Sequence, residues 1–253
     1  MTAAVGAIGE SETMVDEQRI LLDLNALHAG YGSAMVLHGI DMTVRSHEFV
    51  GLLGANGAGK STLLRAISGI VQPRSGEILL DGQDIARAKP QAVVQAGIAQ
   101  VAEGHRIFGK LTVEQNLRLG AYTRRLTTTE LAHSVGLIWE LFPQLAERPK
   151  SSAASLSGGQ QQMLAIGQAL MAAPKLLLLD EPSAGLAPVV IEQLAEGLRE
   201  LRRGGLTILI VEQHIPLTLS LADRIYVMRN GKIVVDGIPS ASCTDAMLQA
   251  AYI

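Results

Sequence analysis

A glycine-rich segment at residues 54–62, G-A-N-G-A-G-K-S-T, constrains the fold of this chain more than any other stretch. It matches the phosphate-loop pattern G-x-x-x-x-G-K-[ST] at every fixed position. An apolar run at residues 49–53 predicts a buried strand before it, and residues 62–67 predict a helix after it. In this strand-loop-helix arrangement, backbone N–H groups surround a phosphate at the positive end of the helix. The segment therefore predicts a nucleotide-binding site rather than an ordinary glycine-rich turn.

The side chains of this loop predict how a nucleotide is held. We expect the Lys60 ammonium to contact the β- and γ-phosphates, and the Ser61 hydroxyl to be an oxygen ligand of Mg²⁺. The other nucleotide-binding residues that we predict in the loop are Gly54, Asn56, Gly57, Gly59 and Thr62. ATP and Mg²⁺ are therefore the predicted cofactors.

The alternation of apolar runs and helical patterns indicates an α/β fold. Runs rich in Val, Ile and Leu at residues 49–53, 98–101, 175–180 and 206–212 are separated by helical segments. This alternation is typical of a mostly parallel sheet that is covered by helices on both faces.

Two parts of the chain depart from that alternation. From residue 104 to about residue 155 the pattern is helical, so we predict a helical subdomain inserted at about residues 104–172. Residues 1–19 show no periodicity, and we expect a flexible tail there. The nucleotide-binding domain is then expected to span residues 20–253.

The composition narrows the classes of function. Of the 253 residues 48% are hydrophobic, which suits one large α/β domain, whereas only 3% are aromatic and the net charge is −3. So few aromatic side chains and no basic excess argue against nucleic acid as a partner. The single cysteine, Cys243, excludes an internal disulfide, and no apolar stretch approaches the ~20 residues that span a bilayer. The first residues do not resemble a signal peptide, so we expect a soluble chain that reaches a membrane only through partners.

Two carboxylates follow directly on one of the buried strands. The run of leucines at residues 176–179 ends in Asp180 and Glu181. Paired acids at the end of a strand that is buried on both faces indicate that a cation lies there. Asp180 is therefore a predicted Mg²⁺ ligand, and Glu181 is the predicted base that polarises the attacking water.

A second glycine-containing helix start precedes the acidic strand. The sequence L-S-G-G-Q places Ser157, Gly158, Gly159 and Gln160 where a helix begins, which again suits an anion. The ordered set of phosphate loop, L-S-G-G-Q and L-L-L-L-D-E-P resembles the ATP-binding subunits of ABC transporters over essentially residues 20–253.

That resemblance implies a P-loop NTPase fold of the ABC ATPase type, with an antiparallel β region on the N-terminal side of the core sheet. It also implies that two ATPase subunits pack head to tail. Each ATP then lies between the phosphate loop of one subunit and the Ser-Gly-Gly-Gln signature of the other. Tyr31 matches the aromatic residue that stacks on adenine in this family.

Shorter segments resemble more closely one ATPase of the branched-chain amino acid importers. They are E-G-H-R-I-F at 103–108, L-T-V-E-Q-N-L at 111–117, Q-Q-M-L-A-I-G at 161–167 and G-L-A-P at 185–188. The implied partners are a second, different ATPase, two permeases and, indirectly, a periplasmic or lipoprotein substrate-binding protein. The implied location is the cytoplasmic face of the inner or plasma membrane.

Two positions depart from the pattern of most ABC ATPases. Glu103 stands where most of them have Gln, and Gln213 stands where most have the switch His, with His214 one place later. We predict Glu103 as a further oxygen ligand of Mg²⁺, and Gln213 and His214 as catalytic residues beside Glu181. Because Gln carries no positive charge at neutral pH, we expect this chain's own site to be slower than its partner's.

Three other functions stay open. One is a soluble ABC ATPase without permeases, although such proteins usually fuse two cassettes or carry long coiled-coil insertions. Another is import of urea or short-chain amides by similar machinery. The third is a largely regulatory nucleotide-binding subunit, which Gln213 favours and Glu181 argues against.

Bulky apolar residues in the helical segment suggest a permease contact. They are Ile107, Phe108, Leu111, Trp139 and Leu141. We expect some of them to line a groove for a cytoplasmic helix of a permease, and the alternative is that they pack the core of the helical segment itself.

Overall fold

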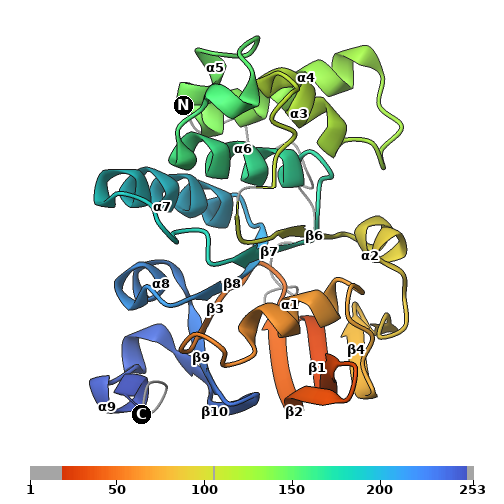
Figure 1. The fold of residues 1–253 in the computed structure, drawn as a ribbon, viewed down its shortest axis with the longest axis vertical. Coiled ribbons are helices and arrows are strands. Elements are labelled where there is room, and N and C mark those ends of the chain that lie inside the picture. Colours follow the sequence, from red (N-terminus) through yellow and green to blue (C-terminus); the bar gives the residue numbers. More distant parts are fainter. Residues whose placement is uncertain (1–18, 105, 250–253) are drawn as a thin grey trace.

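The computed structural model describes residues 19–104 and 106–249, so residues 1–18 of the predicted tail and the end of the predicted domain lie outside it (Figure 1). The strands are β1 (Ile20–Tyr31), β2 (Ala34–Arg45), β3 (Phe49–Leu53), β4 (Ser75–Leu80), β5 (Gln83–Asp84), β6 (Ile98–Val101), β7 (Leu176–Asp180), β8 (Thr207–Glu212), β9 (Arg224–Arg229) and β10 (Lys232–Pro239). The helices are α1 (Lys60–Ile67), α2 (Pro90–Ala96), α3 (Val113–Gly120), α4 (Thr128–Leu141), α5 (Pro143–Ala146), α6 (Gly158–Leu170), α7 (Pro188–Arg203), α8 (Ile215–Leu221) and α9 (Asp245–Gln249).

These strands form two sheets. One has the order β10-β9-β3-β8-β7-β6 and is parallel except for β10, which pairs antiparallel with β9. The other has the order β2-β1-β4-β5 and is antiparallel throughout. The predicted α/β fold, with a mostly parallel core sheet and an N-terminal antiparallel region, is confirmed.

The six-stranded sheet separates two hydrophobic cores. Successive side chains of a strand point to opposite faces. In β7, Leu177 and Leu179 therefore pack with α6 and α7, whereas Leu176 and Leu178 pack with α1 and the antiparallel sheet. Figure 1 shows α6 and α7 on one side of the sheet and α1, β1 and β2 on the other. A strand buried on both faces needs apolar residues at every position, which explains the unbroken leucine run.

Helices α3 to α6 fill the segment for which a helical subdomain was predicted, and they gather at one end of the molecule (Figure 1). They pack on the same core as α7 and α8. Their separation from the rest of the chain as a subdomain stays a prediction. Within residues 19–104 and 106–249, no helix combines the length and the apolar character that crossing a bilayer requires.

Candidate nucleotide-binding site

Three neighbouring parallel strands end at one edge of the six-stranded sheet. Leu53 at the end of β3 pairs with Glu212 at the end of β8, and Asp180 at the end of β7 pairs with Val211. The segments that leave these ends carry the phosphate loop, Glu181 and Gln213. Parallel strands bring their carboxyl ends together, so residues far apart in the sequence meet here in one crevice.

The phosphate loop has a backbone that favours glycine. Gly57 and Gly59 have φ angles of 78° and 110°, in the left-handed region. At Gly54 a Cβ atom would lie 2.5 Å from the carbonyl oxygen of Met228, so only glycine fits. Gly59 is also the N-cap of α1 and provides no capping side chain. The N–H groups of the first turn of α1 are therefore available to a phosphate, as the motif predicts.

Lys60 brings a buried positive charge to the centre of this loop. Its side chain is only 4% exposed. The ammonium donates to the carbonyl oxygens of Gly54 at 2.9 Å and Ala55 at 3.1 Å, and it lies 3.0 Å from a carboxylate oxygen of Glu181. The charge is thus placed between the loop and the predicted catalytic base.

Ser61 and Asp180 meet across 119 positions of sequence. The Ser61 hydroxyl donates to Asp180 Oδ1 at 2.9 Å. Burial raises the pKa of the Asp180 carboxyl, and the charges of Glu181 and Glu103 raise it further, against the hydrogen bond from Ser61 and the charge of Arg65. A buried carboxylate whose ionised form is disfavoured gains from a divalent cation nearby.

The hydroxyl of Ser61 and the carboxylate of Asp180 are the hard oxygen ligands that Mg²⁺ prefers. No three His, Cys, Asp or Glu side chains of the described residues lie close enough together to hold a metal by themselves. Mg²⁺ usually keeps several water ligands and binds through one or two protein groups plus substrate phosphates. The pair therefore fits Mg²⁺ that arrives with a nucleotide.

Gln213 lies against the predicted catalytic base. Its amide nitrogen donates to both carboxylate oxygens of Glu181, at 3.1 and 2.9 Å, and to the side-chain oxygen of Asn56 in the phosphate loop. Glu181 itself has a φ angle of 46°, in a region that costs a residue with a side chain of the order of 1 kcal/mol. Gln213 thus ties a strained Glu181 to the phosphate loop.

His214 has a different partner. Its ring nitrogen Nδ1 accepts a hydrogen bond at 3.1 Å from the backbone N–H of Leu217 and caps α8. The two neighbouring side chains leave the end of β8 in different directions, so the structure brings Gln213 and not His214 to Glu181. The structure gives His214 a capping role, and its predicted catalytic role stays a prediction.

Glu103 and Tyr31 lie at the margin of the site. Glu103 is exposed in the turn after β6, and its charge acts on both Asp180 and Arg65. Tyr31 is 44% exposed at the end of β1, and its hydroxyl accepts hydrogen bonds from Arg65 at 2.9 Å and Thr62 at 3.5 Å. Burial acts to raise the pKa of the Tyr31 phenol, but these two hydrogen bonds outweigh it and lower the pKa. The hydroxyl end of the ring is thus fixed in place, and almost half of the side chain is exposed.

The signature residues begin α6. The Ser157 hydroxyl accepts from the Gln160 N–H at 3.3 Å, and the Gln160 side chain accepts from the Ser157 N–H at 3.1 Å, which is a capping box. A Cβ atom on Gly159 would lie 2.1 Å from a methyl group of Val190 in α7. Because α6 packs on the opposite face of the sheet from α1, the signature and the phosphate loop of one chain lie apart (Figure 1).

Two residues near the site were missed by the sequence analysis. Arg65 holds the Tyr31 hydroxyl, and Glu212 is a buried acid between Ser183 and Gln213. Glu212 ends an apolar strand, as Asp180 does, so the same signal could have found it. Arg65 stands in the regular pattern of α1 and gave no such signal.

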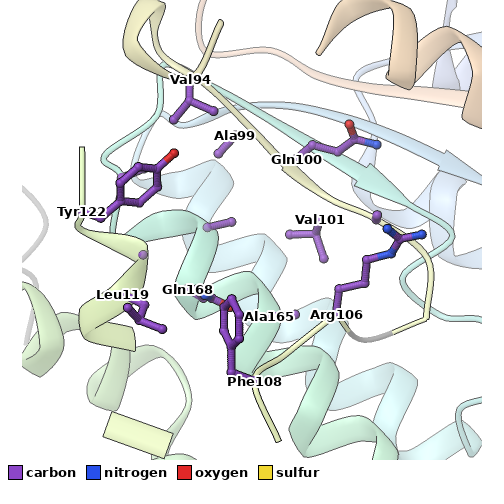
Figure 2. A pocket seen from close by; sticks show the side chains of 14 residues that line it. Val94, Ala99, Gln100, Val101, Arg106, Phe108, Leu119, Tyr122, Ala165 and Gln168 are labelled. Atoms are coloured by element: carbon purple, nitrogen blue, oxygen red, sulfur yellow. The ribbon is translucent and has the colours of Figure 1, made fainter. Parts of the chain in front are cut away.

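A separate hollow, which we name the β6 groove, opens beside β6 (Figure 2). It has a volume of about 410 Å³ and is lined mainly by apolar side chains from β6, α6, the end of α3 and the segment after β6. Phe108 is 55% exposed and Tyr122 is 69% exposed at its rim. Figure 2 labels Gln100 at the opposite side, and the Gln100 Oε1 atom is buried and accepts no hydrogen bond within the described part of the chain.

Some of five bulky residues were expected to line a groove; Phe108 does so, and Ile107, Leu111, Trp139 and Leu141 do not. Ile107, Trp139 and Leu141 are partly buried against the core to which α6 and α7 contribute. This agrees with the alternative that such residues pack a core and not a groove. The fully buried side chain of Asn116 fixes the backbone of Phe108. Its oxygen accepts a hydrogen bond from the Phe108 N–H at 2.8 Å, and its nitrogen donates to the Phe108 carbonyl at 3.1 Å.

The sequence model of the family described as ABC transporter matches residues 37–184 of this chain, which include the phosphate loop, the signature and the Asp180–Glu181 pair. The chain belongs to the ABC transporter family. It is an ATP-binding ATPase of that family, as the sequence analysis predicted.

Relatives and solved structures of the family extend the similarity to nearly the whole chain. The chain is 43% identical over 233 residues to the high-affinity branched-chain amino acid transport ATP-binding protein BraG of Pseudomonas aeruginosa, covering 92% of this chain and 99% of BraG. It is 35% identical to a probable branched-chain amino acid transport ATP-binding protein, LivF, of Archaeoglobus fulgidus, covering 83% and 89%. The solved structure of MJ1267, an ATP-binding cassette of an ABC transporter, superposes with a TM-score of 0.82 at 27% identity, covering 92% of this chain and 99% of that one.

Proposed function

We propose that this chain is one of the two ATPases of an importer for branched-chain amino acids, and that permeases hold it on the cytoplasmic face of the membrane. The similarity to the BraG protein along nearly all of both chains carries this proposal. The four short segments quoted above from the same subfamily agree with it.

In the proposed reaction, the backbone of the phosphate loop and the ammonium of Lys60 hold the β- and γ-phosphates of ATP. Tyr31 stacks on the adenine ring. Glu181 accepts a hydrogen bond from the water that attacks the γ-phosphate and so polarises it. Gln213 keeps the Glu181 carboxylate in place through its two hydrogen bonds. Mg²⁺, when bound to Ser61 and Asp180, neutralises charge on the phosphate oxygens.

Lys60 and Glu181 also lie next to each other in the proposed site. Their charged groups are 3.0 Å apart. Lys60 is therefore placed where it can contact both the γ-phosphate and the carboxylate of the proposed base.

We further propose that a second ATPase subunit packs head to tail on this chain. The signature at the start of α6 lies on the other face of the sheet from α1 and is exposed at Ser157 and Gly158. An exposed helix start with small residues and a Ser cap can receive the γ-phosphate of a nucleotide that is held by another chain.

For the permease we propose the β6 groove as the docking site. A cytoplasmic helix of the permease would cover the exposed rings of Phe108 and Tyr122. The groove is next to the turn that carries Glu103, so movement of a docked helix would reach the edge of the nucleotide site through that short segment.

The test is transport in cells that lack this gene. Uptake of labelled leucine, isoleucine and valine should be lost and should return with the wild-type chain but not with Lys60→Ala. Uptake of urea and short-chain amides, measured in parallel, should not change. Unchanged leucine uptake in the deletion strain would refute the proposal, and a loss confined to urea or amides would replace the proposed substrate.

A further inference from the structure

Glu212 is a buried carboxylate that the proposed mechanism does not use. It is the last residue of β8, it is 2% exposed, and it pairs in the sheet with Leu53 just before the phosphate loop. Among the described residues it forms no ion pair with Lys or Arg. A buried carboxylate is costly unless other groups compensate its charge, so its hydrogen bonds indicate its role.

Backbone N–H groups from two different segments provide that compensation. Glu212 Oε1 accepts from the N–H of Ser183 at 2.9 Å. Glu212 Oε2 accepts from the N–H groups of Gln213 at 3.1 Å and His214 at 3.3 Å. One oxygen therefore holds the loop that follows Glu181, and the other holds the turn that carries Gln213.

These bonds close a ring of contacts around the catalytic base. Ser183 is two residues after Glu181, and the turn between them is closed by a hydrogen bond of 3.1 Å from the Ala184 N–H to the Glu181 carbonyl. The side chain of Gln213 returns to the Glu181 carboxylate. A shift of either segment would change the distance between Gln213 and Glu181, and Glu212 is the side chain that joins the two segments.

We propose that Glu212 is a positioning residue for ATP hydrolysis, which fixes the main chains of the Glu181 loop and the Gln213 turn relative to each other. It touches neither the nucleotide nor the water and acts only through these two segments. The inference rests on the roles proposed above for Glu181 and Gln213.

The chemistry of the three donors explains why a carboxylate stands here. Both oxygens of a carboxylate are acceptors, whereas a Gln side chain has one acceptor and one NH₂ donor. In Glu212→Gln the NH₂ group would face the N–H of Ser183 or those of Gln213 and His214. Only one of the two segments can then stay bonded, although the size and shape of the side chain are preserved.

Steady-state ATP hydrolysis by the assembled complex tests this, in a background in which the partner's own site carries the change that matches Glu181→Gln, so that only the site of this chain is measured. We expect Glu212→Gln to lower kcat about tenfold or more, because small misplacements of catalytic groups have effects of this size, and to leave KM for ATP within about twofold. The matched control is Glu48→Gln, another buried acid that accepts a backbone N–H, from Arg45 at 2.9 Å, but pairs with Arg224 away from the site. Both variants should unfold at a lower temperature than wild type, and only Glu212→Gln should have a lower kcat.

A double-mutant cycle separates positioning from general loosening of the fold. If Glu212 acts through Gln213, then Glu212→Gln should lower kcat less than about twofold further in a Gln213→Ala background. If each change lowers kcat by the same factor alone and in combination, the two residues act independently and the inference is wrong. It is also wrong if Glu212→Gln keeps kcat within about twofold of wild type while Glu181→Gln and Gln213→Ala lower it.

If Glu181→Gln and Gln213→Ala both keep the wild-type rate, the proposed roles of those residues fail, and the inference fails with them. Should Glu212→Gln not fold, hydrogen exchange of the wild-type chain decides. The amides of Ser183, Gln213 and His214 lie outside helices and outside strands, and we expect them to exchange at least tenfold more slowly than exposed loop amides. Exchange as fast as in exposed loops would refute the contacts on which the inference depends.

Discussion

The nucleotide site and the β6 groove use their side chains in opposite ways. At the site, each polar group is already bonded to another: Lys60 to Glu181, and Ser61 to Asp180. In the groove, the rings of Phe108 and Tyr122 are more than half exposed, and Gln100 Oε1 has no hydrogen-bond partner in the described ranges. The side chains of the first region hold one another in place, whereas the second region presents exposed rings to a further chain.

The two regions therefore differ in what the structure of a single chain shows about them. In the nucleotide site the contacts within one chain show how its side chains are placed, because these residues constrain each other. A surface that another chain completes shows only the chemistry that its partner must match, here an apolar face that can cover the rings of Phe108 and Tyr122. Substitutions in the two regions should therefore fail differently: those in the site should change nucleotide binding or hydrolysis, and those in the groove should change transport alone.

Lys60→Ala is expected to have the largest effect of these variants, and the effect should be a loss of ATP binding at the nucleotide site. Loss of a buried charge directed at the phosphates should cost about 2–5 kcal/mol of binding, which weakens ATP binding about 30-fold to several thousand-fold. Calorimetric titration with ATP measures this. Lys175→Ala is the control, because Lys175 is 56% exposed and pairs with Asp81 on the surface. Equal affinity of Lys60→Ala and wild type would remove the phosphate loop from nucleotide binding.

Gly158→Asp and Glu181→Gln compare the two ATP sites of an assembled transporter. In the head-to-tail arrangement, Gly158→Asp places a carboxylate against the γ-phosphate of the partner's ATP and should nearly abolish ATPase activity. Glu181→Gln disables this chain's own site. If the partner has the usual Gln and His, that site is the slower one by ~10²-fold or more, because it lacks a positioned donor. Much of the activity should then remain in the complex. Equal and nearly complete losses from Glu181→Gln and the matching change in the partner would show two equivalent sites.

Phe108→Ala should act only through the groove. The exposed ring contributes little to the fold, so thermal unfolding and ATP affinity should stay close to wild type, while uptake falls by about tenfold or more, as for the central aromatic residue of an interface. Ile70→Ala is the matched control, since Ile70 is 60% exposed but does not line the groove. Normal uptake with Phe108→Ala would exclude this groove as the permease contact.

Asp180→Asn should give the smallest and least obvious effect, a gain in stability. The pKa of Asp180 in the folded chain is raised, so the folded state binds its proton more readily than the unfolded state does. The stability should therefore fall as the pH rises from the ordinary Asp pKa through the raised one, and the ionised group costs stability above that window. Asn removes this cost, and we expect a higher unfolding temperature than wild type at neutral pH, with less difference at acidic pH. A variant that melts lower at neutral pH would contradict this.

Much of the site could be predicted because short sequence motifs determine which residues lie in it. Gly54, Lys60 and Ser61 follow from one short motif, and the continuous apolar run before Asp180 showed that the strand is buried on both faces. The edge at which these segments meet then follows from the parallel order of β3, β8 and β7.

Orientation of side chains could not be predicted in the same way. Gln213 and His214 are neighbours, and only the geometry at the end of β8 shows that one turns to Glu181 and the other caps α8. The groove was also only partly foreseen, because apolar residues such as Trp139 and Phe108 look alike in sequence. Which of them is covered depends on how α4 and α6 pack.

The backbone of Glu181 has a consequence for how such a chain could change over generations. Its φ angle of 46° is easy for glycine and unfavourable for glutamate, so Glu181→Gly should relieve local strain while it removes the proposed base. A lineage that no longer needs hydrolysis at this site would have no reason to keep Glu at position 181. An inactive descendant should therefore drift toward Gly or Asn there, and persistence of Glu in that conformation would mark a site that is still in use.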